Sequence, residues 1–143
     1  MAAELGYSNV YAFRDGLPAW IKAGYPVKSI EKLPRADVEN ITATDLQQMV
    51  NKGEDFLLLD IRLPSLALER WIEFPRRVNV PLDDLQDQLG TLPANKKVVI
   101  VDAIGKRTSV AGRYLKLKGY KDVAKMMGGM DKWAKDGLPV ASR

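Results

Sequence analysis

Cysteine and histidine are both absent from this sequence, and their absence excludes several kinds of chemistry. Without cysteine there is no disulfide, no thiolate nucleophile and no cysteine-ligated zinc. Without histidine there is no Ser–His or Cys–His catalytic pair, and the side chain that most often transfers protons near neutral pH is missing. We therefore expect neither a metal site nor a cofactor, and the redox state of the compartment is left open.

Long apolar runs are scarce as well. The longest, residues 56–59, stops at Asp60, whereas a membrane-spanning helix needs roughly 18 apolar residues in succession. Residues 1–4 (MAAE) lack the basic start of a secretory signal. We expect a soluble protein without a membrane partner and slightly favour the cytoplasm.

Charge of one sign is not concentrated anywhere along the chain. The 22 Lys and Arg residues and 18 Asp and Glu residues leave a net charge of +4. A nucleic-acid groove would need basic residues clustered with aromatic ones, and that pattern is missing. We expect a solvated basic surface and no nucleic acid as a partner, while local anion binding stays open. The scattered positions include Arg76, Arg77, Lys96, Lys97, Lys106, Arg107, Lys116 and Lys118.

One segment of the sequence occurs twice. The stretch GYSNV at 6–10 returns as GYKDV at 119–123, an offset of 113 positions (120 minus 7). Because this offset is the size of a domain, we interpret the repeat as a tandem duplication. Further pairs at the same offset are Gly16 and Gly129, Trp20 and Trp133, Lys22 and Lys135, Gly24 and Gly137, and Pro26-Val27 and Pro139-Val140.

The two copies differ in extent. Residues 41–143 hold a complete repeat, whereas residues 1–28 match only its last part, so we expect them to be the tail of a preceding repeat whose body is missing. Residues 29–40 are interpreted as a linker. The alternative is an N-terminal extension that resembles the tail by chance. Residues 1–28 could be loose, pack on the complete domain, or form a dimer by pairing with another molecule.

Helices and strands alternate along the complete repeat. Thr42 followed by Asp45 is typical of a helix N-terminus, and the β-branched run at 98–101 is the strongest strand. Such alternation predicts an α/β fold in three layers, with a central parallel sheet and helices on both faces. The predicted strands are 56–59, 78–80, 98–101 and 123–127, and the predicted helices begin at Thr42, after Arg107 and at Met130 and end at Gly53, Gly119 and Gly137.

Two polar segments follow the predicted strands at their carboxyl ends, where parallel sheets bind ligands. Asp60 and Arg62 follow the first strand, and residues 102–107 lead into a helix whose N-terminus favours anions.

The order of landmarks resembles the rhodanese (sulfurtransferase) family over 41–143. The matches are Asp60 and Arg62 to Asp-x-Arg, Asn79-Val80-Pro81 to Asn-x-Pro, Gly105, Arg107 and Thr108 to the Cys-x-x-Gly-x-Arg-Ser/Thr loop, and Gly119-Tyr120, Gly128-Gly129 and Trp133 to the closing motifs.

The resemblance implies a rhodanese-like three-layer fold and, for the family, thiosulfate sulfurtransferase activity. The sequence departs from the family at the sulfur-carrying residue, because Asp102 stands at the position of the catalytic cysteine. A carboxylate cannot hold a persulfide, and Thr108 or Ser109 has no histidine to activate it. The family's Gly-His-Ile-Pro-Gly stretch is changed too, since residues 72–76 (IEFPR) keep only the proline.

We therefore expect an active-site-like loop without a catalytic residue. Asp102 is expected to fill the anion cradle itself, accepting bonds from the loop amides and from Arg107 or Lys106. It either only caps the helix or has a regulatory role. The loop comprises Asp102, Ala103, Ile104, Gly105, Lys106, Arg107 and Thr108, and Asp60 and Arg62 are expected to brace it.

Several other residues are expected to be structural. Trp133 and Trp20 are interpreted as core anchors rather than ligand platforms. Arg76-Arg77 is expected to be a solvated turn, with a partner contact as the alternative. Three methionines are expected to fill the core, namely Met126, Met127 and Met130.

Three functions are compatible with these features. The first is a catalytically inactive rhodanese-like domain of a tandem protein, with a structural or regulatory role or with another rhodanese-like repeat or other protein as its partner; sulfurtransferase activity would then reside in the missing repeat. The second is a small-anion-binding module that uses the loop amides with Lys106 and Arg107. The third is an enzyme with Asp102 as nucleophile, for which a metal or general acid could come only from Asp60, Asp83, Asp84 and Glu73.

Overall fold

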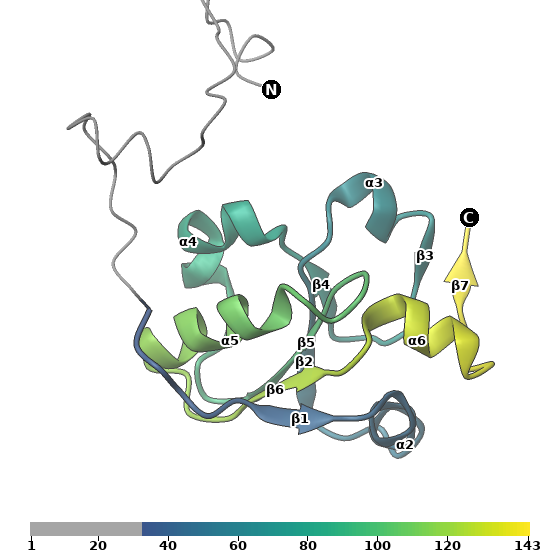
Figure 1. Cartoon of the computed structure of the whole chain (residues 1–143), viewed down its shortest axis with the longest axis horizontal. Helices are drawn as coiled ribbons and strands as arrows, with labels where there is room; N and C mark the ends of the chain where they lie inside the picture. The colour runs from purple at the N-terminus through teal and green to yellow at the C-terminus, as the bar shows by residue number, and fades with distance from the viewer. Residues whose placement is uncertain (1–32) are drawn as a thin grey trace, which may run out of the picture. The chain divides into compact units, whose positions relative to one another are not determined.

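A computed structural model describes residues 33–143, which form one compact unit (Figure 1). Its centre is a five-stranded sheet in the order β1-β6-β5-β2-β4, and every neighbouring pair is parallel. The strands are β1 (Glu39–Ile41), β2 (Phe56–Asp60), β4 (Arg77–Asn79), β5 (Lys97–Val101) and β6 (Val123–Met126). The predicted α/β fold with a central parallel sheet is therefore confirmed.

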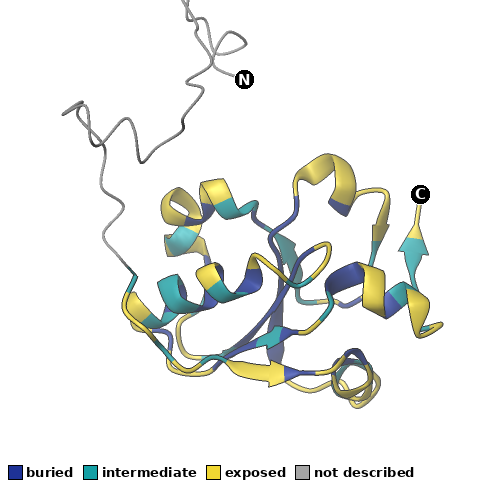
Figure 2. Cartoon of the chain, in the orientation of Figure 1, coloured by how far each residue is buried: buried dark blue, intermediate teal, exposed yellow. Residues whose placement is uncertain are grey.

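Helices cover both faces of the sheet. The helices α2 (Ala43–Asn51) and α6 (Gly129–Lys135) pack on one face, and α4 (Leu85–Gln88) and α5 (Thr108–Leu117) pack on the other (Figure 1). A hydrophobic core cluster lies on each face of the sheet, and side chains of β2 point alternately into the two. Phe56 and Leu58 belong to the cluster under α2 and α6, and Leu57 and Leu59 belong to the cluster under α4 and α5. The central strands are consequently buried, and exposed residues lie on the outer faces of the helices (Figure 2).

Local signals in the sequence explain where the helices begin and end. The side chain of Thr42 accepts a hydrogen bond from the backbone N–H of Asp45, and the Asp45 carboxylate accepts one from the backbone N–H of Thr42. This capping box fixes the start of α2, as predicted. Gly53 and Gly119 follow α2 and α5 with φ of 63° and 96°, the left-handed backbone that favours glycine after a helix.

The linker predicted over 29–40 extends too far. Glu39 and Asn40 belong to β1, which pairs with β6, and the side chain of Val38 packs where a Cβ on Gly112 of α5 would stand. This edge strand is short and polar on its exposed side, so the sequence carried no period-2 signal for it. The tail predicted at 1–28 and the anchor role of Trp20 lie outside the described residues.

Besides α4 and the short 3-10 helices on either side of it, three further elements were not predicted. They are the short helix α3 (Pro64–Ala67) and the strands β3 (Arg70–Trp71) and β7 (Ala141–Ser142), which pair antiparallel as a separate ribbon. The segment between β3 and β4 contributes Ile72 and Phe74 to the core, and the Phe74 ring stacks on Phe56 with centroids 4.3 Å apart. Within 33–143, no helix has the length and apolarity that a membrane span requires.

The core residues agree with the sequence analysis in most places. Trp133 is fully buried, and its indole N–H donates to the carbonyl of Pro139 at 2.8 Å. Met126 and Met130 are buried as predicted, but Met127 is 47% exposed, because β6 ends at Met126 and the next side chain leaves the sheet. The core role predicted for Met127 is therefore wrong.

Candidate functional site

The site centres on the loop between β5 and α5. Asp102 is the first residue after β5 and is only 4% exposed. One carboxylate oxygen accepts the backbone N–H of Gly105, and the other accepts the backbone N–H of Arg107 at 2.8 Å. The loop therefore closes around the carboxylate, which takes two of the amides that precede the helix.

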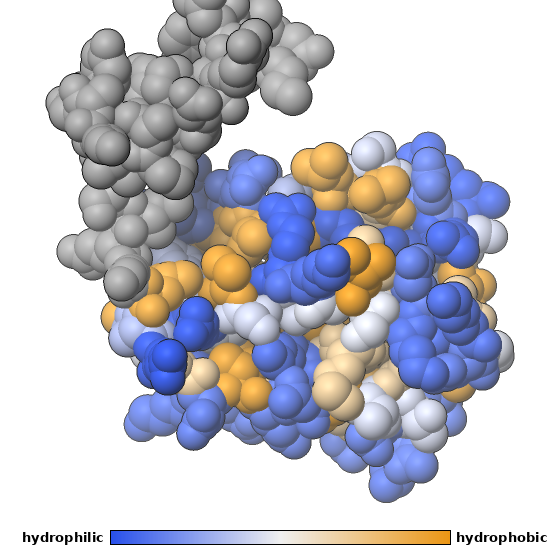
Figure 3. All heavy atoms as spheres, in the orientation of Figure 1, coloured by the Kyte–Doolittle hydropathy of each residue, from blue (hydrophilic) through white to orange (hydrophobic). Residues whose placement is uncertain are grey.

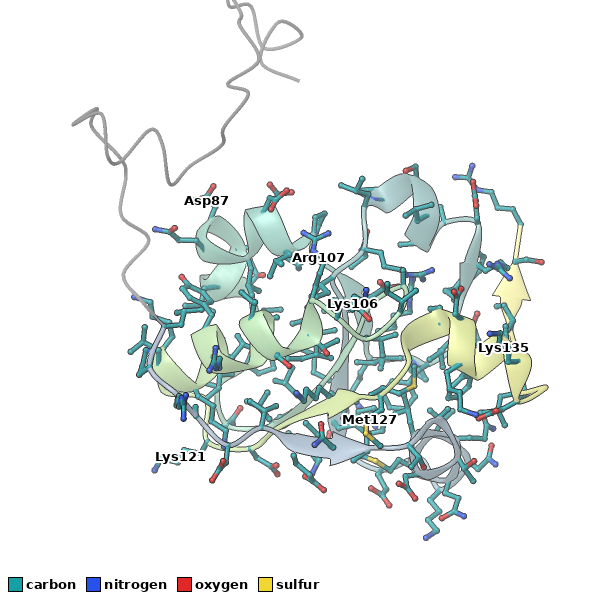
Figure 4. The ribbon with its side chains drawn as sticks, in the orientation of Figure 1. Asp87, Lys106, Arg107, Lys121, Met127 and Lys135 are labelled. Carbon is teal, nitrogen blue, oxygen red and sulfur yellow. The ribbon has the colours of Figure 1, made fainter. Side chains whose placement is uncertain are left out.

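The cations of the loop point elsewhere. Among the residues that the structure describes, neither Lys106 nor Arg107 donates a side-chain hydrogen bond to Asp102, so that part of the expectation is wrong. The guanidinium of Arg107 lies 3.7 Å from the carboxylate of Asp83. The side chains of Lys106 and Arg107 are both exposed (Figure 4). Their charge is thus available to solvent, because the loop amides already satisfy Asp102.

The Gly128-Gly129 turn holds the loop by backbone contact. The Met130 N–H donates to the carbonyl of Asp102 at 2.9 Å. A Cβ on Gly105 would lie 2.6 Å from the Gly128 nitrogen, and a Cβ on Gly129 would lie 2.5 Å from the carbonyl carbon of Ala103. The family-like glycines are therefore required by a close approach of two backbones, in addition to their positive φ.

A buried ion cluster braces the neighbouring strand end. The carboxylate of Asp60 accepts from Nε and Nη2 of Arg62 at 2.9 and 2.6 Å and from Nη2 of Arg77 at 3.0 Å. Arg62 also donates to the carbonyl of Arg70 at 2.8 Å, which ties the cluster to β3. Asn79 donates to the carbonyls of Asp60 and Arg62, at 2.9 Å each.

Arg76 and Arg77 do not form the solvated turn that was predicted. The side chain of Arg77 is 16% exposed and enters the ion cluster on Asp60, although its Nε has no partner among the described residues. Arg76 donates to the carbonyl of Glu54 at 2.7 Å and lies over the ring of Phe74. Nothing in the sequence around these two arginines marked them as partly buried, because their partners lie in a strand about 20 residues away.

A pocket opens beside the loop. Its volume is about 310 Å³. The polar part of its wall comes from Arg62, which pairs with Asp60, and from the loop. Its rim is apolar, since Leu63, Leu66 and Ile104 are each about half exposed. Figure 3 shows apolar surface over α3 and the loop beside strongly hydrophilic surface. The sequence analysis missed this rim, because isolated leucines in a loop have no periodic signal.

The acidic residues proposed for an Asp102-based enzyme are not brought together. Glu73 accepts from the indole N–H of Trp71, and Asp83 faces Arg107. Across 33–143, no three acidic side chains are grouped closely enough to hold a metal ion. Among residues 33–143, the acidic side chains are therefore not gathered around Asp102 as metal-assisted catalysis would require.

Comparison with known proteins agrees with this architecture. The family model for the rhodanese-like domain matches residues 42–136. A protein of Allochromatium vinosum named "Sulfurtransferase" is 32% identical over 105 residues, which cover 73% of this chain and 96% of that protein. A rhodanese-related protein from Thermoplasma volcanium superposes with a TM-score of 0.64 at 26% identity, covering 72% of this chain and 97% of the other.

A rhodanese-like domain protein from Staphylococcus aureus superposes equally well. Its TM-score is 0.63 at 27% identity, and the match covers 73% of this chain and all of the other. Sequence and structure thus point to the same family, and the chain belongs to the rhodanese-like family.

Proposed function

We propose that this chain contains a catalytically inactive rhodanese-like domain of a tandem sulfurtransferase-type protein, with a structural, regulatory or partner-binding role. The observation that carries the proposal is Asp102, which occupies the loop where the family holds its cysteine and satisfies two loop amides. The sequence contains no cysteine that could take its place.

Sulfur transfer needs a polarisable nucleophile, which these residues do not supply. A persulfide forms on a thiolate, and a carboxylate has no sulfur to carry it. The Thr108 hydroxyl is buried and donates to the carbonyl of Gly105 at 3.2 Å. The Ser109 hydroxyl accepts from Lys125. Neither hydroxyl contacts a histidine, the usual activator of a serine nucleophile, because the sequence contains none.

The tandem arrangement is supported by the residues that recur in the sequence. In the complete repeat, Gly119, Gly129 and Gly137 all have positive φ, and Trp133 is fully buried. The hydroxyl of Tyr120 donates to the carbonyl of Leu92 at 2.7 Å. The residues shared by the N-terminal segment are thus those on which this fold depends, as expected for a segment derived from a second rhodanese-like domain. Sulfurtransferase activity of the whole protein would then reside in that other domain.

The partner-binding role would use the rim of the pocket. Leu63, Leu66 and Ile104 expose apolar surface around a site whose anion cradle is already filled. A second rhodanese-like repeat, or another protein, is the partner that we propose for this surface. Apolar residues grouped and rimmed by polar ones are typical of protein contacts.

The direct test is transfer of sulfur from thiosulfate to cyanide by the purified chain. We expect no turnover above background, and measurable turnover would contradict the proposal. Replacing Asp102→Cys should restore a thiol inside the loop and allow about one sulfane sulfur to be bound per chain. Ala103→Cys is the matched control, because Ala103 is an exposed residue of the same loop and its side chain receives none of these amide bonds. If both variants retained sulfur equally, the loop amides would not favour a sulfur atom at position 102 over one at position 103.

A small-anion-binding module is the second candidate, favoured by the exposed charges of Lys106 and Arg107. Asp102 opposes it, because its carboxylate takes two amides and repels a second anion. Calorimetry with thiosulfate separates the candidates. The module predicts binding that weakens on Arg107→Ala, and the inactive-domain proposal predicts no binding at this loop.

A further inference from the structure

A second polar pocket lies on the other side of α5, away from the Asp102 loop. Ser109 and Arg113 are one helical turn apart on α5 and share a face. Lys125 reaches this face from β6, and its ammonium donates to the Ser109 hydroxyl at 2.5 Å. The segment before β1 forms the opposite wall, and the pocket has a volume of about 400 Å³.

The two cations of this pocket lack an acidic partner. No carboxylate within 33–143 lies in ion-pair distance of Arg113 or Lys125, although seven other Lys and Arg side chains there are paired. Both side chains are partly buried, so solvent screens their mutual repulsion less than at an open surface. Lys125 also contacts the first turn of α5, where the helix dipole favours a negative charge.

Lys125 is not shared by the two copies of the repeated segment. In the N-terminal copy of the sequence, the residue that corresponds to Lys125 at the same offset is Ala12. The lysine therefore distinguishes this copy from the N-terminal one, and its place beside Arg113 without an acidic partner needs an explanation. An anion seated between the two cations would supply one.

We propose that Ser109, Arg113 and Lys125 form a binding site for a small oxyanion of the phosphate class, separate from the rhodanese-like loop. The Arg113 guanidinium and the Lys125 ammonium would donate to its oxygens. The Ser109 oxygen already accepts from Lys125, so its hydrogen is free to donate to the same anion. Asp37 also lines the pocket, is exposed and forms no ion pair with either cation, so its carboxylate weakens the site without filling it.

The test is calorimetry and amide NMR of the full chain with inorganic phosphate in a phosphate-free, low-salt buffer. We expect saturable binding, with the largest shifts at Ser109, Arg113 and Lys125. Since a hydrogen bond to a charged group is worth enough to change affinity about tenfold, Lys125→Met and Arg113→Met should each weaken binding roughly tenfold. Asp37→Asn should strengthen it, because a repelling charge is removed.

Lys135→Met is the matched control, since this exposed lysine lies on α6 and outside the pocket. It should leave the affinity for phosphate unchanged. Circular dichroism identifies any variant that fails to fold. Because Arg113 and Lys125 are replaced separately, the site can still be tested with one variant if the other does not fold. Absence of phosphate binding would overturn the proposal. Binding that survives both methionine variants, or that depends only on Arg107, would overturn it as well and would favour the Asp102 loop.

Discussion

At the scale of single residues, the buried charges of Asp60, Arg62 and Arg77 are the most demanding feature of the site. Burying a carboxylate is costly unless it is paired and hydrogen-bonded, and here two guanidinium groups meet one carboxylate. The cluster joins the carboxyl end of β2 to β4 and the α3–β3 segment. It thereby holds the wall of the pocket opposite the Asp102 loop.

Asp60→Asn should destabilise the domain by about 3 kcal/mol, because the buried guanidinium of Arg62 and the partly buried one of Arg77 would lose their counter-ion. Urea unfolding of the variant and the wild type measures this difference. Asp55→Asn is the control, since Asp55 pairs with Lys96 and Arg76 at an exposed position and should cost much less. Equal losses for the two variants would contradict the role given to the cluster.

Gly129→Ala tests the close approach of the two loops. An added Cβ would lie 2.5 Å from the backbone of Ala103, and φ of 62° strains any other residue. Gly119→Ala has the same kind of strain, about 1–3 kcal/mol, but nothing within 4 Å of its Cβ. We expect the first variant to lose more stability and its Gly105 amide to exchange faster with solvent. If the two variants behave alike, the backbone contact does not hold the loop.

At the scale of elements, α2 shows how a local signal becomes a pH-dependent contribution. The hydrogen bond from the Thr42 backbone N–H, helped by the Thr42 side chain, holds the pKa of Asp45 below its usual 3.8. A carboxylate whose pKa is lowered by folding stabilises the folded state above its unfolded pKa, and that contribution is lost as the pH falls through the lower folded value.

The difference in unfolding free energy between the wild type and Asp45→Asn should therefore be largest at neutral pH and shrink below about pH 3.8. Chemical denaturation across this range measures it. Thr42→Ala should cost about 1 kcal/mol at neutral pH, because the N-cap hydrogen bond is lost. A difference that grew on acidification would contradict the assignment of the capping box.

At the scale of the whole molecule, the members of both core clusters within the described residues 33–143 run from Val38 to Val140. The sheet separates the two clusters, and each is closed by its own pair of helices. A chain of residues 33–143 should therefore fold by itself, with a thermal midpoint close to that of the full chain. Circular dichroism of both chains measures the difference. A large loss on removal of residues 1–32 would instead support their packing on the complete domain.

The sequence by itself determined the layered fold, the family and the loop that holds Asp102. These follow from local patterns, since buried strands, helix caps and turn glycines each have a signal within a few residues. The edge strand β1 was not predicted, because it is short and two of its three side chains are exposed.

Only the tertiary structure decided which polar side chains meet. Arg77 enters the Asp60 cluster from a different strand, Lys125 reaches Ser109 from 16 residues away, and Arg107 turns from Asp102 toward Asp83. The physical reason is that periodicity specifies which face of an element is buried, whereas the partner of a charge depends on the packing of elements that are distant along the chain.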